Sequence, residues 1–165
     1  NMIRTACAGF AAAAGGADAI TIRPFTDAIG RPTGLGRRVA RNLHILLGEE
    51  SHIGKVTDPA AGSYLHETLS DELAHSAWAL FQEIERRGGL TEAFATGWLQ
   101  GEIAAVRDKR LQQIASGEDV ILGVTQHPDP HPKPVETNGK WPALDVPASA
   151  LSPIRLAARF EGATS

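Results

Sequence analysis

The sequence predicts a mostly helical α/β segment, and three observations lead to this fold class. Apolar residues recur at helical spacing over most of residues 5–117. One stretch, 17–25, alternates as a strand does, and it lies between two helical stretches. Beyond residue 126 prolines recur and no apolar period continues. The order helix, strand, helix is typical of α/β folds.

The first predicted helix covers Thr5 to Ala14 and is rich in alanine, the best helix former. It is expected to end at Gly15-Gly16, because glycine readily adopts the conformation of a helix C-terminus. A strand is predicted from Ala17 to Phe25, with Ile20 and Ile22 on one face. A single strand cannot satisfy its own backbone, so its partners are expected from outside this chain or from another copy.

A second helix is predicted from Thr33 to Glu50. Its apolar residues share one stripe, which consists of Leu35, Val39, Leu43 and Leu46 or Leu47. Arg37, Arg38 and Arg41 lie mostly around the rest of the helix. They form either a solvated or subunit-facing side or an ion-pair network with acids nearby, and we favour the network. The candidate acids are Glu49, Glu50 and Asp58.

The third helical stretch opens with Thr68 and Asp71, whose spacing fits a capping box. Gly88-Gly89 is expected to close it. Five apolar residues at helical spacing predict a buried stripe on this helix: Leu73, Ala77, Leu80, Phe81 and Ile84.

A fourth helix is predicted from Thr91 to Ser116, with Gly117 as its stop. Gly97 and Gly101 weaken its first half by about 1 kcal/mol each relative to alanine. The β-branched run Val120 to Thr125 predicts a short edge strand.

The pattern divides the chain into three parts. Residues 1–64 hold the helix, strand and helix, and residues 65–126 hold the later helices and the short strand. Residues 127–165 form a proline-rich extended tail, in which Ile154 to Phe160 is expected to make one helical turn. The sequence begins without methionine, and we expect it to be a piece of a longer chain.

Composition excludes several classes of function. A formal charge of −3 gives no general attraction to nucleic acid or anionic lipid. No stretch reaches the roughly 20 apolar residues that span a bilayer. We therefore expect a soluble, cytoplasmic protein that binds neither nucleic acid nor membrane. Cys7 lies among small apolar residues and is expected to be buried.

No residue is predicted to be catalytic or to bind metal. The 6 histidines lack a cysteine or carboxylate at zinc-ligand spacing. Ser51 and His52 are adjacent, but a triad needs a base that reaches the hydroxyl and a third group that orients the base. The glycines from Gly30 to Gly36 lack the strand-to-helix context of a phosphate loop.

Several short motifs carry a family resemblance. They run from Arg37 to Asn42, from Glu49 to His52, from Asp58 to Tyr64 and from Trp78 to Glu85, followed by Gly88-Gly89. Together they resemble the coenzyme-B12-dependent acyl-CoA mutases, typified by methylmalonyl-CoA mutase. The resemblance covers about the first 125 residues and continues weakly in the tail.

The resemblance implies the C-terminal end of a TIM-type (β/α)8 barrel followed by linker helices. Ala17 to Phe25 would be the eighth strand, Thr33 to Glu50 the eighth helix, and Leu65 to Gly117 the linker. The family isomerises carbon skeletons of acyl-CoA substrates, as from methylmalonyl-CoA to succinyl-CoA, with adenosylcobalamin. The cobalt-binding motif and the earlier barrel strands do not occur in this sequence, so the segment alone is predicted to be inactive.

One residue could touch the cofactor. Catalytic members place a glutamate associated with the adenosyl ribose after the eighth strand, and an ungapped comparison puts Asp27 there. Its other interpretation is an acid that interacts with the dipole of the following helix.

Two hypotheses remain for the whole protein. Arg23-Pro24-Phe25 and Gly15 to Asp18 look like the small, non-catalytic subunits of heterodimeric mutases. The chain is then either part of the isomerase, completing its substrate barrel and subunit interface, or part of a silent structural partner. Expected partners are the remaining barrel residues or a mutase subunit, and acyl-CoA in the complete enzyme.

Overall fold

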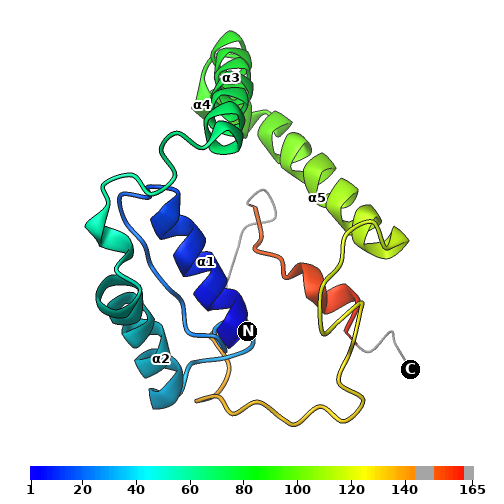
Figure 1. Ribbon diagram of the computed structural model, residues 1–165. Helices are drawn as coiled ribbons and strands as arrows, with labels where there is room; N and C mark the ends of the chain where they lie inside the picture. The colour runs from blue at the N-terminus through cyan, green and yellow to red at the C-terminus, as the bar shows by residue number, and fades with distance from the viewer. Residues whose placement is uncertain (144–150, 162–165) are drawn as a thin grey trace. The chain divides into compact units, whose positions relative to one another are not determined.

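The computed structural model describes residues 1–143 and 151–161, and the described chain is mostly helical (Figure 1). Its elements are α1 (Met2–Ala14), α2 (Gly34–Ile45), the π-helical turn η1 (Leu46–Glu50), the 3-10 turn η2 (Ile53–Lys55), α3 (Tyr64–Arg86), α4 (Leu90–Ala95), α5 (Trp98–Ser116) and the 3-10 turn η3 (Leu156–Arg159). Within these residues the only β pairing is an isolated bridge between Leu122 and Gln126. None of the described helices is both long and apolar enough to cross a membrane.

The chain divides into two compact units, which we describe separately. Unit 1 contains Asn1–Ala74 and Pro134–Ala143, and unit 2 contains His75–Lys133 and the described residues from 151 onward. The predicted division into residues 1–64, 65–126 and 127–165 rests on sequence pattern and stays a prediction.

In unit 1, α1 packs against α2 and η2 through small residues (Figure 1). Gly9 is the buried residue of α1, and a β-carbon there would lie 2.9 Å from Ile22 Cδ1 and 3.3 Å from Leu47 Cδ1. Leu47 itself is buried. Cys7, predicted to be buried, is instead exposed, because only the Gly9 side of α1 is covered.

The predicted strand from Ala17 to Phe25 is wrong as secondary structure. Residues 17–24 run between α1 and α2 as an irregular segment (Figure 1). The backbone groups of residues 18–23 make no hydrogen bond within the described chain. A strand exists only with a neighbour to pair with, and the described residues supply none.

The α2 helix is confirmed, but its buried face lies one position along from the predicted stripe. Thr33 caps it, with its hydroxyl accepting from Gly36 N at 3.3 Å. Gly36 and Ala40 are buried, whereas Leu35 is 63% exposed. Small residues face the core here because the Pro24 and Pro32 rings come close to Gly36.

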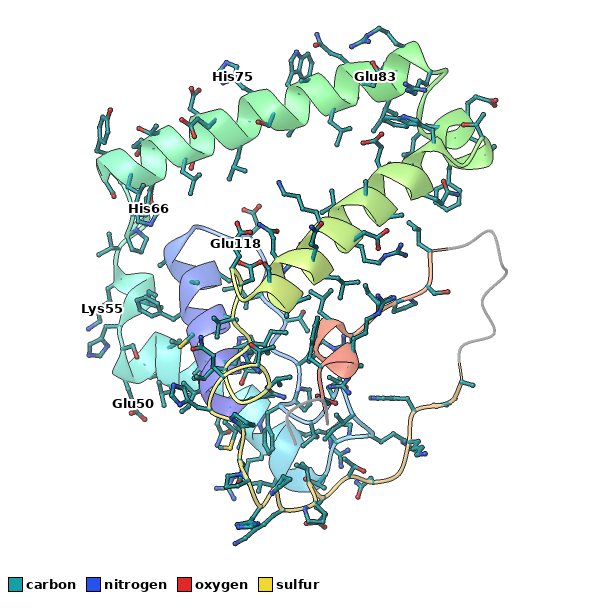
Figure 2. The ribbon with its side chains drawn as sticks, turned by 90° about the vertical axis from the view of Figure 1, so that its right-hand side faces the viewer. Glu50, Lys55, His66, His75, Glu83 and Glu118 are labelled. Atoms are coloured by element: carbon teal, nitrogen blue, oxygen red, sulfur yellow. The ribbon has the colours of Figure 1, made fainter. Side chains whose placement is uncertain are left out.

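Helix α3 begins earlier than predicted, and the capping box of Thr68 and Asp71 is wrong. Ser63 O accepts from Glu67 N at 3.0 Å, so the helix is under way before Thr68. The predicted buried stripe is present as a pattern, but no residue of α3 is buried. His66 and His75 mark the beginning and the middle of this helix in Figure 2.

Glycines end the helices of unit 2. Gly88 and Gly89 adopt positive φ at the end of α3, and Gly117 does so at the end of α5, all as predicted. Gly97 was predicted only to weaken a continuous helix, but at φ 80° it interrupts the helix and separates α4 from α5. The predicted strand from Val120 to Thr125 is a turn, in which Ile121 O accepts from Val124 N and Thr125 N.

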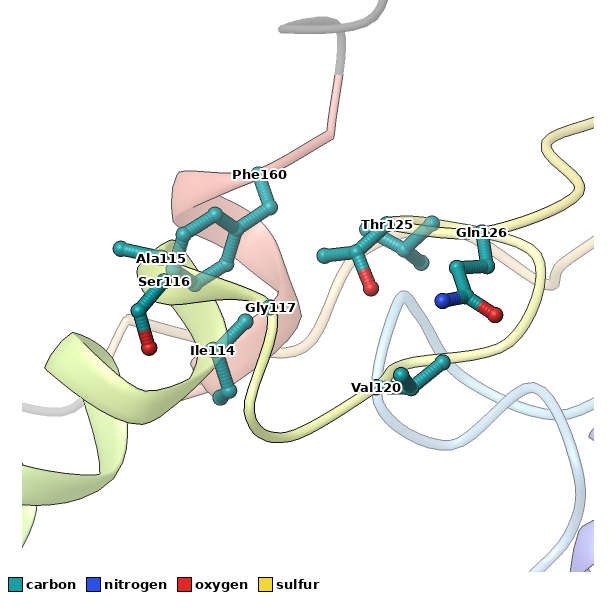
Figure 3. Close-up of a pocket in the computed structure, with 9 residues that line it drawn as sticks. Ile114, Ala115, Ser116, Gly117, Val120, Thr125, Gln126 and Phe160 are labelled. Atoms are coloured by element: carbon teal, nitrogen blue, oxygen red, sulfur yellow. The ribbon is translucent and has the colours of Figure 1, made fainter.

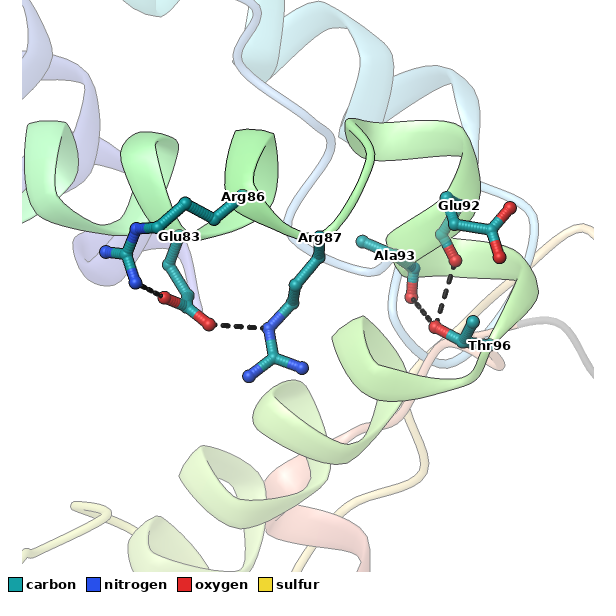
Figure 4. A network of polar contacts seen from close by, with 6 residues as sticks. All are labelled: Glu83, Arg86, Arg87, Glu92, Ala93 and Thr96. Atoms are coloured by element: carbon teal, nitrogen blue, oxygen red, sulfur yellow. Dashed lines mark hydrogen bonds and ion pairs between the residues drawn. The ribbon is translucent and has the colours of Figure 1, made fainter.

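A polar cluster links the end of α3 to the helices that follow (Figure 4). Glu83 forms ion pairs with Arg86 and Arg87, the latter at 2.6 Å. The Arg87 guanidinium also lies 4.3 Å from the centre of the Trp98 ring. Thr96 Oγ1 donates to Glu92 O at 2.9 Å and thereby satisfies a carbonyl at the end of α4.

Candidate functional site

The candidate site is the loop between the irregular segment and α2, residues 25–32. The loop is tightly turned: Asp27 N donates to Pro24 O at 2.9 Å, and Ile29 N and Gly30 N donate to Thr26 O. These bonds fix the backbone of the loop around Asp27. Asx and glycine residues favour such turns.

Asp27 is largely covered and carries a cationic neighbour. Its side chain is 10% exposed and forms an ion pair with Arg23, whose own side chain is 75% exposed. The Oδ2 atom of Asp27 is the one that faces Arg23 Nη2. Arg23 was not among the predicted site residues, although its spacing of four from Asp27 could have indicated it.

Thr26 adds a second buried oxygen next to Asp27. The residue is 2% exposed, and its Oγ1 has no hydrogen-bond partner in the described structure. A β-carbon at Gly36 would lie 3.6 Å from this oxygen, so the hydroxyl sits beside the first turn of α2. The loop thus holds a buried hydroxyl without a hydrogen-bond partner in the described structure beside a carboxylate that pairs with Arg23.

Residues from the tail complete the site, and no sequence pattern indicated them. Trp141 Nε1 donates to Asp27 O at 2.8 Å. Asn138 N donates to Arg31 O at 2.7 Å, and Arg31 N donates to Gly139 O at 2.8 Å. Asn138-Gly139 is a turn signal, but a turn signal does not identify a partner more than a hundred residues away.

The arginine cluster of α2 does not form the network we favoured. None of Arg37, Arg38 and Arg41 pairs with Glu49, Glu50 or Asp58 in the described structure. Arg37 Nη1 instead donates to Pro32 O at 2.9 Å, which ties α2 to the loop. Asp58 accepts from Ala60 N within its own turn.

A second candidate is a hollow in unit 2, which lacks the charged groups of a reaction centre. In unit 2, a hollow of about 380 Å³ lies at the end of α5, beneath Phe160 (Figure 3). Its lining residues carry no charged side chain. No group of three metal-binding side chains comes together in the part of the chain that the structure describes.

Comparison with known proteins places the chain. A family model described as methylmalonyl-CoA mutase matches residues 1–145. The chain is 42% identical over 161 residues to the methylmalonyl-CoA mutase small subunit of Streptomyces virginiae, covering 98% of the chain and 26% of that protein. It is 44% identical over 167 residues to a probable small subunit of Mycobacterium tuberculosis H37Rv, covering 98% and 25% respectively.

A third relative is named without a subunit label. It is the methylmalonyl-CoA mutase of Cereibacter sphaeroides, 42% identical over 136 residues, which are 82% of this chain and 19% of that protein. The chain spans about a quarter of the length of the small subunits that it matches. The matched residues include the loop with Asp27 and all of α1 to α5, and the chain belongs to the methylmalonyl-CoA mutase family.

Proposed function

We propose that this chain forms the C-terminal end of a TIM-type substrate barrel in a cobalamin-dependent acyl-CoA mutase. The complete enzyme would convert methylmalonyl-CoA to succinyl-CoA, an intramolecular group transfer. Residues 1–64 would supply the last helix, strand and helix, and residues 65–126 the linker. The carrying observation is the unbonded segment of residues 18–23 between α1 and α2.

The surroundings of this segment support a role as a barrel strand. Ile20, Thr21 and Ile22 line an open hollow of about 350 Å³ on the side of α1. The same residues line another of about 380 Å³ on the side of α2. A parallel strand in a barrel has neighbours at both edges and is covered on its outer face by helices. Open backbone groups fit such neighbours.

The Asp27 loop fits the ribose of adenosylcobalamin, the cofactor that this family implies. A ribose hydroxyl can donate to a carboxylate, and the Asp27 carboxylate has lone pairs to accept it while keeping its ion pair with Arg23. Thr26 Oγ1, next to it, is a buried oxygen without a hydrogen-bond partner in the described structure. When bound, the cofactor supplies radical chemistry, while protein groups bind it, orient it and exclude water. Asp27 would hold the sugar, and no residue of this chain is proposed to be catalytic.

Asp27→Asn in the full-length protein, assembled with its partner subunit, tests this role. The amide keeps the shape of the side chain and removes the charge. If Asp27 holds the ribose, the adenosylcobalamin concentration for half-maximal activity should rise about tenfold, the loss expected for a hydrogen bond to a charged group. Asp58→Asn, outside the loop, is the control. An unchanged cofactor requirement would exclude Asp27 from the cofactor site.

The alternative function is that of a silent small subunit, which only stabilises a catalytic partner. Two observations favour it: the relatives named as small subunits, and the Arg23 guanidinium that already occupies the Asp27 carboxylate. In this case the protein is half of a heterodimer in the cytoplasm, and its partner is the catalytic mutase subunit.

Purifying the full-length protein alone separates the two functions. A barrel with its own activity should bind adenosylcobalamin, with a change in its absorption spectrum, and isomerise methylmalonyl-CoA. A silent subunit should do neither alone and should raise activity or stability only when mixed with the partner. The segment of 165 residues should be inactive in both cases.

A further inference from the structure

Residues 137–141, which we call the strap, cross the loop that carries Asp27. Three hydrogen bonds of 2.7–2.8 Å join the strap to the loop. Arg31 N donates to Gly139 O, Asn138 N donates to Arg31 O, and Trp141 Nε1 donates to Asp27 O. A fourth runs from Asn138 Nδ2 to Pro32 O at 3.2 Å. Both the strap and the loop belong to unit 1, so these contacts lie within one compact unit.

The loop is shaped to receive the strap at Gly30. This glycine is buried, and a β-carbon there would lie 2.8 Å from Gly139 O and 2.9 Å from Thr137 Oγ1. Any side chain would push the strap away. On the other side of the contact, Gly139 has φ 88°, a conformation that side chains other than glycine rarely adopt. A glycine is therefore required on each side of the contact.

We infer that the strap is a positioning element for the Asp27 carboxylate, with Asn138 and Trp141 as positioning residues. Trp141 holds the loop at Asp27 itself, and Asn138 with Gly139 holds it four residues later at Arg31. A loop fixed at both points cannot swing the carboxylate away from Arg23. The consequence for cofactor binding rests on the proposed role of Asp27, whereas the positioning itself does not.

Hydrogen exchange of the Arg31 amide in the full 165-residue chain tests the positioning. Gly30→Ala breaks the contact sterically from the loop side, and Gly139→Ala breaks it from the strap side. Either change should speed exchange at Arg31 about threefold to tenfold, the factor for losing one neutral hydrogen bond.

Matched controls exist for both changes. Gly34→Ala adds a methyl group where no atom lies within 4 Å, and Gly123→Ala meets the same strain as Gly139→Ala at φ 79° but lies in unit 2. Neither control should change exchange at Arg31. Equal exchange in all four variants, or equal acceleration in all four, would overturn the inference.

Trp141→Phe separates this inference from the proposed function. It keeps a six-membered aromatic ring and removes the Nε1 donor with the rest of the five-membered ring. Trp78→Phe on the exposed face of α3 loses the same atoms and is its control. In the chain, Trp141→Phe should speed exchange of the Asp27 amide, whose bond to Pro24 O opens when the loop is released, and Trp78→Phe should not. In the assembled mutase it should raise the adenosylcobalamin requirement at nearly constant kcat.

The two readouts fail independently. Unchanged Asp27 exchange in Trp141→Phe would refute the strap. Faster exchange, with no effect of either Trp141→Phe or Asp27→Asn on the cofactor requirement, would keep the strap as the element that fixes the loop and reject the cofactor role of Asp27.

Discussion

The loop of residues 25–32 is held by residues distant in sequence, whereas helix α3 makes its regular bonds within itself and buries none of its residues. The loop has no regular secondary structure, yet Thr26 within it is 2% exposed. The helix is 23 residues long, yet Leu65, Leu73 and Trp78 are each more than half exposed. Regular structure and burial are therefore separate properties in this chain.

Helix α3 carries an exposed apolar face, which is the composition expected of a surface that packs against another part of a protein. Leucines at 65, 69, 73 and 80 follow one side of the helix. Further round the helix, Trp78 and Phe81 stack at 5.1 Å between ring centres. Burying one such side chain stabilises a protein by about 1.5–3 kcal/mol. The described residues do not cover this face, which fits the proposed place of α3 as a linker against the rest of a mutase.

The largest expected effect comes from truncating one leucine in each region. Leu47→Ala removes a side chain that is 8% exposed and should lower the free energy of unfolding by about 2–5 kcal/mol. Leu73→Ala removes one that is 61% exposed and should change it by less than about 0.5 kcal/mol. Urea unfolding followed by circular dichroism measures both.

The same two variants can be compared in the assembled mutase. If another part of the enzyme covers α3, Leu73→Ala should there cost about 2 kcal/mol or more, as core truncations do. A loss that stays negligible in the assembly would mean that α3 faces solvent in the complete protein as well.

Two glycine-to-alanine changes should have a smaller effect, which differs between the two units. Gly101→Ala lies in α5 with no atom within 4 Å of the new methyl group and should stabilise by about 0.5–1 kcal/mol. Gly9→Ala gains the same helix preference but pushes against Ile22 and Leu47, so it should stabilise less or destabilise. Thermal unfolding compares them, and an equal gain would show that the contact of α1 with η1 is loose.

Local chemistry could be predicted from the sequence, and distant contacts could not. Gly88, Gly89 and Gly117 end their helices because positive φ suits glycine wherever it occurs in a fold. The stripe of α3 was found as a pattern, but whether a pattern is buried depends on what covers it. The segment of residues 17–24 has the alternation of a strand and is irregular because pairing needs a second strand.

The candidate site shows the same limit. Asp27 came from the family resemblance, and its Arg23 partner lies close enough in sequence to have been found. The strap could not be found, because Trp141 reaches Asp27 across 114 positions of sequence that contain no signal of the pairing. Loop closure over such a length depends on the whole fold and not on local preference.

The smallest expected effect is a pH dependence at the end of the described chain in unit 2. Hydrogen bonds and charge from Arg155 hold the pKa of Glu161 below its usual range, against the opposing effect of partial burial. A lowered folded-state pKa stabilises the turn above the unfolded value of roughly 4.3, and the stabilisation is lost as the pH falls through the folded value. Because Glu161 is 46% exposed, solvent screening keeps the contribution below about 1 kcal/mol.

Acidification from about pH 6 to about pH 3 should therefore loosen η3, which precedes Phe160. The amide chemical shift of Phe160 reports this change in a series of NMR spectra. Glu161→Gln removes the titrating group and should flatten the Phe160 titration. Asp108→Asn removes a carboxylate whose pKa is also lowered, by its hydrogen bond to the adjacent Arg107. This second pair joins neighbouring residues of α5 and closes no turn, so its loss should leave the Phe160 titration intact. If Asp108→Asn flattened the titration as Glu161→Gln does, the Arg155–Glu161 pair would not be what holds the turn.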